Sequence, residues 1–205
     1  MPKKTLKEKK PEVLAPAGDR DCFLAAIAAG ADAVYCGLKK FSARMAAENF
    51  TIGELAVLAR LARARGVRVY VALNSLIKPD ELGDAAEIVF RLKREVKPDA
   101  LIIQDLGVLS LAAQAGFKGE IHLSTLANLS FPSAVRLAGF FPNVTRVVLP
   151  RELSIDEIKK VAGACPKGVS LEVFVHGALC YGVSGRCYWS SFLGGKSGLR
   201  GSCVQ

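Results

Sequence analysis

Residues 52–74, IGELAVLARLARARGVRVYVALN, contain a helix pattern that is followed directly by a strand pattern. Leu55, Leu58 and Leu61 recur at helical spacing and the arginines fall outside that stripe, which predicts an amphipathic helix. Gly66 marks the helix end, because glycine is the usual residue just beyond a helix C-terminus. The valine-rich run at 67–74 predicts a buried strand. A helix and a strand joined by so short a connection form the repeating unit of a parallel α/β fold.

The same unit recurs along the chain. Short β-branched runs alternate with Ala/Leu-rich helical segments. The seven runs are EVLAPAG (12–18), DAVYCG (32–37), VRVYVALN (67–74), DALIIQD (99–105), EIHLST (120–125), TRVVLP (145–150) and SLEVFVHG (170–177). Because these runs are apolar on both faces, they predict a parallel sheet covered by helices.

Seven strands and six helices at this spacing predict an α/β fold of the (β/α) TIM-like barrel type, incomplete in this chain. The first strand is followed by LAPAGD, which is not the G-x-G-x-x-G turn of a dinucleotide-binding doubly wound sheet. No eighth strand pattern follows, so we expect an N-terminal portion of a longer protein. We expect a disordered basic tail at 1–11, a barrel portion at 12–177 and a Gly/Cys-rich segment at 178–205.

Composition and charge narrow the function classes. The chain has no apolar run of the roughly 18 residues that a membrane span requires and no secretory signal pattern, so we expect a cytoplasmic protein. The net charge is +9, of which the five lysines and Glu8 of residues 1–10 supply +4. The positive charge on the remainder of the chain allows a polyanionic partner such as RNA. A solvated surface with a lysine-rich tail explains the charge equally well.

Polar residues follow the predicted strands, and in a barrel the carboxyl ends of the strands converge on one mouth where active sites lie. His122 differs, because it lies within a strand pattern and is expected to be a core histidine. Some residues of this ring, such as Asp19 and Asp105, could instead cap helices. The ring comprises Asp19, Cys36, Asn74, Asp105, Ser124, Thr125, Arg151, Glu152 and His176.

Three cysteines lie in the last part of the chain, spaced Cys180-x₆-Cys187-x₁₅-Cys203 among glycines, serines and basic residues. This spacing matches neither a zinc ribbon nor a bacterial ferredoxin. A reducing cytosol disfavours disulfides, and thiolates in Gly/Ser loops can bind a soft metal or an iron–sulfur cluster. Burial as small hydrophobic residues is the alternative.

The segment EVFVHGALCYGVSGRCYWS (172–190) resembles the signature of the collagenase-like peptidase family U32. Trp189 departs from the signature, standing where the family has an aliphatic residue. Further stretches that resemble the family are LAPAG, DAVYCGL, FSARMAAENFT, HLST, LPRELS and RGSCVQ. The residues that match the signature are Glu172, Phe174, Gly177, Ala178, Leu179, Cys180, Gly185, Cys187 and Ser190.

The resemblance implies more than one activity. Some members of the family are described as metal-dependent peptidases acting on collagen-like substrates, whereas others act in oxygen-independent hydroxylation of ubiquinone precursors or of tRNA and ribosomal RNA bases. Several hydroxylation members carry a four-iron cluster (4Fe-4S), and the positions of Cys180, Cys187 and Cys203 are among its ligands. The fourth ligand is left open between a later residue and Cys36, which at the end of its strand would face the mouth. For Cys36, burial as a small residue of an apolar strand is the favoured alternative.

RNA-base hydroxylation is the function that the sequence favours, because neither H-E-x-x-H nor G-x-S-x-G is present. A small organic co-substrate is expected with it. The alternatives are a peptidase using zinc or another divalent metal on a peptide substrate, a ubiquinone-biosynthesis protein, and a non-catalytic accessory protein. We expect catalytic roles for Asp105, Arg151, Glu172 and His176, and substrate binding by Arg44, Asn74, Ser124, Arg186 and Arg200. For Arg44 and Arg151, ion pairs that brace loops are an equal alternative.

Overall fold

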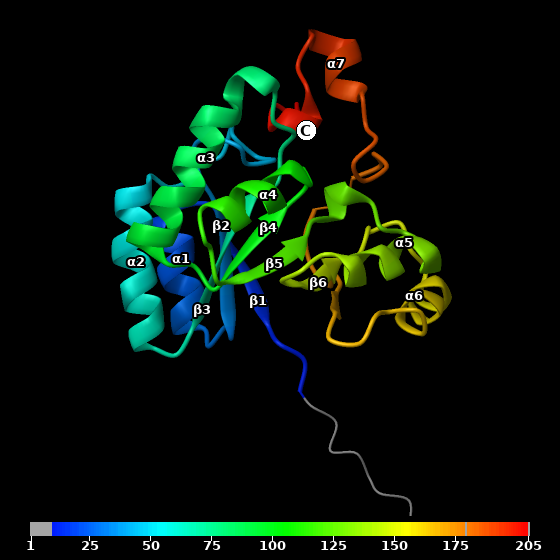
Figure 1. The fold of residues 1–205 in the computed structure, drawn as a ribbon, viewed down its shortest axis with the longest axis horizontal. Helices are drawn as coiled ribbons and strands as arrows, with labels where there is room; N and C mark the ends of the chain where they lie inside the picture. The colour runs from blue at the N-terminus through cyan, green and yellow to red at the C-terminus, as the bar shows by residue number, and fades with distance from the viewer. Residues whose placement is uncertain (1–9, 179, 205) are drawn as a thin grey trace, which may run out of the picture.

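The computed structural model describes residues 10–178 and 180–204, so most of the tail expected at 1–11 lies outside the described residues. One parallel sheet of seven strands runs through the molecule in chain order (Figure 1). The strands are β1 (Leu14–Ala17), β2 (Ala33–Gly37), β3 (Arg68–Leu73), β4 (Ala100–Ile103), β5 (Glu120–Leu123), β6 (Val144–Val148) and β7 (Ser170–Glu172). Six of them fall within the predicted runs and β6 begins one residue before its run, which confirms the seven-strand prediction.

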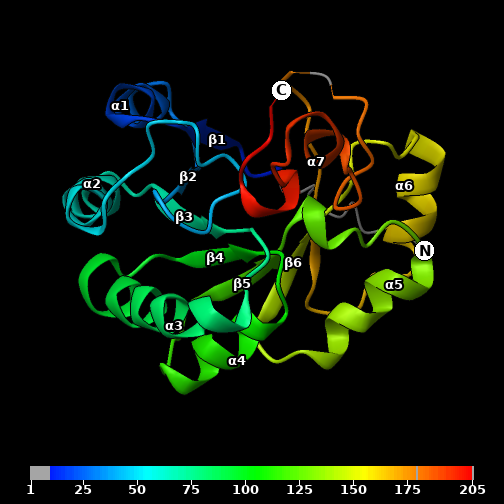
Figure 2. The same cartoon turned by 90° about the horizontal axis from the view of Figure 1, so that it is seen from above.

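Six α-helices connect the strands, and seen from above they ring the outside of the curled sheet (Figure 2). They are α1 (Arg20–Ala28), α2 (Ile52–Ala64), α3 (Leu82–Arg91), α4 (Gly107–Gln114), α5 (Pro132–Leu137) and α6 (Ile155–Ala162). Shorter helical turns are η1 (Pro79–Glu81), η2 (Leu92–Val96), η3 (Thr125–Ala127), η4 (Ala138–Phe140) and η5 (Gly198–Arg200). A further helix, α7 (Trp189–Gly194), belongs to the Gly/Cys-rich segment that begins at residue 178, which we call the Cys-containing segment. The incomplete TIM-like barrel is confirmed.

Local sequence explains where the helices begin. Thr51 caps α2 in a capping box with Glu54, and Ser154 caps α6 in the same way with Glu157, as its sequence predicts. Asp19 accepts a backbone hydrogen bond at the start of α1, so its capping role is confirmed. Among the described residues, no helix is long and apolar enough to cross a membrane.

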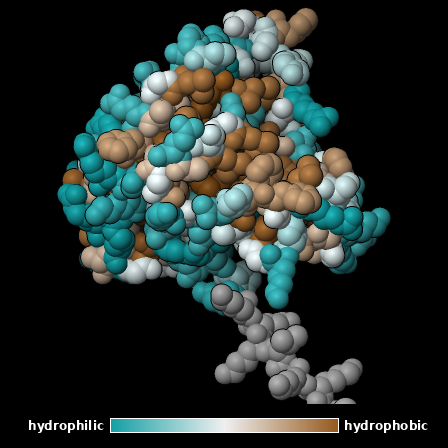
Figure 3. Space-filling view, in the orientation of Figure 1, coloured by the Kyte–Doolittle hydropathy of each residue, from teal (hydrophilic) through white to brown (hydrophobic). Residues whose placement is uncertain are grey.

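The two faces of the sheet have different partners, because successive side chains of a strand point to opposite sides. Val69 and Val71 of β3 pack outward against the helices in the main hydrophobic core. Tyr70 and Ala72 point inward and pack with residues of β2 and β4 in a second, smaller cluster. Apolar side chains also reach the surface on the face that carries α4 and α5 (Figure 3).

The inside of the barrel is charged toward the amino ends of the strands. Arg146 of β6 contacts Glu12, just before β1, at 2.8 Å and Glu172 of β7 at 3.1 Å. Arg68 also pairs with Glu12, and both guanidinium groups lie 5.4 Å from the ring centre of Tyr70. Because β1 and β7 are the two outer strands, Arg146 links both margins of the open sheet.

Candidate active site at the barrel mouth

The Cys-containing segment crosses the carboxyl ends of the strands and is anchored there on two sides (Figure 2). On one side, Ser184 donates from its backbone N–H and, at 3.1 Å, from its hydroxyl to the carboxylate of Glu152, which follows β6. Gly185 lies against the carbonyl of Leu126 in η3, and a Cβ atom there would collide with that carbonyl. The backbone φ of Gly185 is +71°, a conformation that also favours glycine.

On the other side, the segment pairs through its backbone with two loops. The N–H of Leu76, after β3, donates to the carbonyl of Leu199 at 3.0 Å. The N–H of Met45, after β2, donates to the carbonyl of Gly201 at 3.1 Å. Residues from both halves of the sheet therefore determine where the segment lies.

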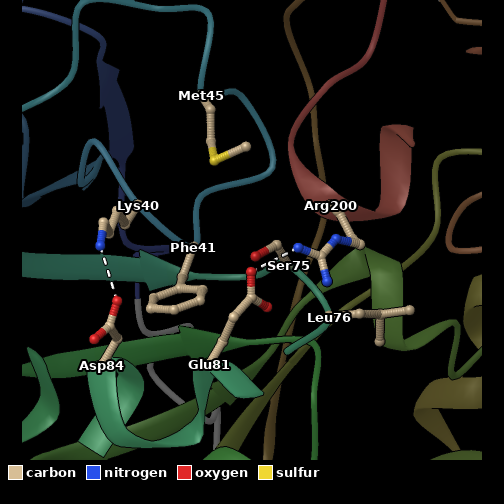
Figure 4. A pocket seen from close by; sticks show the side chains of 8 residues that line it. All are labelled: Lys40, Phe41, Met45, Ser75, Leu76, Glu81, Asp84 and Arg200. Atoms are coloured by element: carbon tan, nitrogen blue, oxygen red, sulfur yellow. Dashed lines mark hydrogen bonds and ion pairs between the residues drawn. The ribbon is translucent and has the colours of Figure 1, made fainter. Parts of the chain in front are cut away.

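A small pocket opens beside this second anchor, with a volume of about 140 Å³ (Figure 4). Arg200 donates to Glu81 at 2.7 Å, and Lys40 pairs with Asp84 at 2.9 Å. Nη1 of Arg200 is buried and has no hydrogen-bond partner among the described residues. Arg200, expected to bind substrate, is thus engaged in fixing the segment to η1. The pocket is lined by Lys40, Phe41, Met45, Ser75, Leu76, Glu81, Asp84 and Arg200.

Cys180 and Cys187 come together around Gly182. A methyl group on Gly182 would lie 2.9 Å from the sulfur of Cys187 and 3.6 Å from the sulfur of Cys180. A hydrogen bond from the Gly182 backbone and the nearby Arg151 lower the pKa of the Cys180 thiol below its usual value. This environment favours the thiolate, which is the form that binds metals.

Cys203 is exposed and follows η5. Within residues 10–178 and 180–204, no three His, Cys, Asp or Glu side chains gather closely enough to hold a metal ion. The soft sulfur donors of Cys180, Cys187 and Cys203 suit an iron–sulfur cluster or zinc, and two of the three are already neighbours. The three cysteines therefore fit such a metal group in the chemistry of their sulfur donors and in the proximity of Cys180 to Cys187.

Cys36 lies elsewhere than expected. Its register partner on β3 is Val71, and both side chains point outward into the core between sheet and helices. The thiol is fully buried there, 3.8 Å from the carbonyl of Tyr70, and burial raises its pKa to about 12. The expectation that Cys36 faces the mouth is wrong, because Tyr35 and Gly37 occupy the inward positions of β2.

The inward residues near the mouth form a second polar group. Glu172 lies at the end of β7, and burial raises the pKa of its carboxyl despite the bond from Arg146. Burial and the charge of Glu172 raise the pKa of Tyr35, whereas Arg44 opposes the shift. Glu172 and Tyr35 therefore influence each other on the inner side of the sheet, and Arg44 acts on Tyr35 from an exposed position after β2. Tyr35 is absent from the sequence-based candidates, and its alternation with Cys36 is the signal that points to it.

Three of the expected site residues brace the loops of the mouth. Asp105 accepts from the backbone N–H of Ile77 at 3.1 Å, which ties the loop after β4 to the loop after β3. Asn74 accepts from the N–H of Ala43 at 2.9 Å, and Ser124 accepts a backbone bond within η3. Their side chains hold backbone in place, so the structure gives them a supporting position around the mouth.

The remaining expected residues lie at the rim. Arg151 follows β6, interacts with Cys180 and is exposed to solvent. His176 and Arg186 are exposed in the segments before and after Cys180. The mouth thus combines a pair of neighbouring cysteines, a partly buried carboxyl and several arginines.

Comparisons with known proteins give the chain a family and relatives. The sequence model of the family described as peptidase family U32 matches residues 18–205 of this chain. The "Collagenase" of Porphyromonas gingivalis is 36% identical over 95% of this chain and 48% of its own length. A 23S rRNA 5-hydroxycytidine synthase of Escherichia coli is 37% identical over 98% of this chain and 30% of its own length. The tRNA hydroxylation protein P of Escherichia coli is 36% identical over 96% of this chain and 43% of its own length.

The chain spans less than half the length of each of these relatives. Among solved structures, that of the U32 peptidase Mk0906 aligns with a TM-score of 0.68 at 13% identity, covering 84% of this chain and 72% of the other. At that identity the similarity supports the fold alone.

Proposed function

Because this chain belongs to peptidase family U32, we propose that it is an iron–sulfur protein for oxygen-independent hydroxylation of RNA bases, with tRNA or 23S rRNA as substrate. The observation that carries the proposal is the pairing of Cys180 and Cys187 above the barrel mouth, where Arg151 favours the thiolate. Relatives named as tRNA and 23S rRNA hydroxylation proteins support the substrate class. Its place of action is the cytoplasm.

The cluster ligands in this proposal are Cys180, Cys187 and Cys203. A bound cluster would supply one-electron chemistry at the mouth. Cys203 would have to move to the other two to serve as the third ligand, and metal binding would contribute the free energy that orders it. The anchors at Glu152 and Glu81 keep the segment across the mouth while it does so.

The residues inside the mouth bind and orient the substrate. Glu172 takes up a proton more readily than an exposed carboxyl, because burial raises its pKa. Arg44, exposed after β2, offers a planar cation to a phosphate or to a carboxylate-bearing small co-substrate. These groups lie on different strands and loops, as in barrel enzymes generally.

Anaerobic purification followed by iron and acid-labile sulfide analysis tests the cofactor. We expect iron and acid-labile sulfide in equal amounts, a loss with Cys187→Ser, and no loss with Cys22→Ser, whose exposed thiol lies on α1. Stoichiometric zinc without sulfide would contradict the cluster. Nucleoside mass spectrometry of tRNA and ribosomal RNA from a strain lacking the protein tests the activity, with the loss of a hydroxylated nucleoside expected.

A metal-dependent collagenase-like peptidase is the second candidate, favoured by the relative named "Collagenase". The same cysteine pair could hold zinc instead of a cluster. Unchanged nucleosides, together with gelatin cleavage that a chelator abolishes, would establish this candidate in place of RNA hydroxylation.

A further inference from the structure

The segment that carries the cysteines also exposes a group of aromatic side chains, which we call the aromatic platform: Tyr181, Tyr188, Trp189 and Phe192. Their exposed fractions are 98%, 67%, 53% and 85%. Large aromatic side chains are normally among the most buried in a protein, so four in twelve residues of one segment require an explanation.

Helix α7 presents its aromatic residues to solvent. Trp189 and Phe192 are three residues apart and lie on the same side of the helix. The residue of α7 that is buried is the polar Ser190, whose hydroxyl accepts the N–H of Val204 at 3.2 Å. This arrangement is the reverse of an ordinary surface helix, which buries its apolar side.

The position of the platform connects it to the candidate site. Figure 1 shows α7 at the end of the molecule where the strands finish, next to the chain's C-terminus. Tyr181 adjoins Cys180 in sequence, and Tyr188 adjoins Cys187. A ligand that lies on the platform would therefore reach the mouth.

The charged side chains of the segment itself are Arg186, Lys196 and Arg200, and the carboxylates of Glu152 and Glu81 reach it from the elements around it. Arg186 and Lys196 are exposed, and neither has an ion-pair partner in the part of the chain that the structure describes. After Glu172 the sequence contains no acidic residue. Unpaired cations beside aromatic rings complement a phosphate backbone with accessible bases, because bases stack on the rings while phosphates meet the cations.

We propose that the aromatic platform binds unpaired nucleotides of an RNA loop by stacking and delivers them to the barrel mouth. The proposal rests on the proposed function for its substrate class, and it adds that the recognised RNA is single-stranded. Double-stranded RNA offers no free base faces for stacking, so the platform discriminates against it.

The fluorescence of Trp189 tests the proposal directly, because Trp189 is the only tryptophan of the chain. The full chain is titrated with an unstructured oligouridine of twelve nucleotides and, separately, with an RNA duplex of the same length. We expect saturable quenching by the single strand and at least tenfold weaker quenching by the duplex. Phe192→Ala and Tyr188→Ala should each weaken single-strand binding about tenfold.

Phe140→Ala is the matched control, because Phe140 is 77% exposed on η4 and lies outside the platform. It should leave binding unchanged. Equal quenching by duplex and single strand, or no quenching by either, would overturn the proposal. A blue shift of Trp189 with protein concentration or with lipid vesicles, but not with RNA, would instead indicate that a second copy or a membrane covers the platform.

Binding and activity can fail independently. Quenching by single-stranded RNA together with unchanged nucleosides in the deletion strain would keep the platform and overturn hydroxylation. Loss of a hydroxylated nucleoside without any RNA-dependent quenching would keep hydroxylation and overturn the platform.

Discussion

At the scale of single residues, His122 illustrates how the barrel interior changes side-chain chemistry. The ring is fully buried, with Nε2 at 3.0 Å from Glu120 and the ring edge-on to Tyr70 at 4.8 Å. Burial lowers the pKa of His122 to about 4; the bond to Glu120 opposes this shift, and Arg146 reinforces it. His122 is therefore the core residue that its place in a strand predicts, and it is neutral at pH 7.

This lowered pKa makes stability depend on pH in a defined window. In the unfolded chain a histidine titrates near 6.5, so between pH 6.5 and about 4 the unfolded state takes up a proton that the folded state does not. Stability is present above that window and is lost as pH falls through it, by about 2 kcal/mol between pH 7 and 5. Urea unfolding at both pH values should show this loss in the wild type and a smaller one in His122→Gln. Equal losses in the two proteins would contradict the prediction.

At the scale of elements, the attachment of the Cys-containing segment to η3 depends on Gly185. Gly185→Ala should detach the segment locally, because the methyl group meets the carbonyl of Leu126 and the φ of +71° disfavours alanine. Hydrogen exchange at residues 180–204 should rise, while exchange in β2 to β5 stays slow.

Gly168→Ala is the control for this prediction. Its φ is +88°, yet a Cβ there meets nothing within 4 Å, so it carries the same backbone cost without the collision. If both substitutions raise exchange in the segment equally, the contact with Leu126 is not what holds it.

The elements also show what the sequence could predict. The strands and the start of α6 follow from local patterns, namely β-branched runs and the Ser154–Glu157 capping box. The outward direction of Cys36 could not be assigned, because a shift of one residue in a strand exchanges its two faces. The anchor between Leu76 and Leu199 is also invisible locally, since it is a backbone bond between segments distant in sequence.

At the scale of the whole molecule, the open sheet carries different chemistry at its two ends. The mouth holds the cysteine pair and Glu172, whereas the amino end holds the ion pairs of Glu12, Arg68 and Arg146. In TIM barrels the active site usually lies at the carboxyl ends of the strands, and the residues at the amino ends contribute to stability. Arg146 belongs to both, because it contacts Glu12 and Glu172.

Arg146→Met should therefore destabilise the entire barrel portion. Its side chain is only 12% exposed, and removing it leaves the partly buried Glu172 without a cation and Glu12 with Arg68 alone, at a cost of about 3 kcal/mol. The midpoint of urea unfolding, followed by circular dichroism, measures the loss.

Lys159→Met serves as the control, because Lys159 pairs with Asp156 on the open surface and its removal should leave the midpoint unchanged. Adding Glu172→Gln to Arg146→Met should recover part of the loss, since the carboxylate left without a cation is then absent. A midpoint for Arg146→Met equal to that of Lys159→Met would refute the idea that Arg146 holds the margins of the open sheet together.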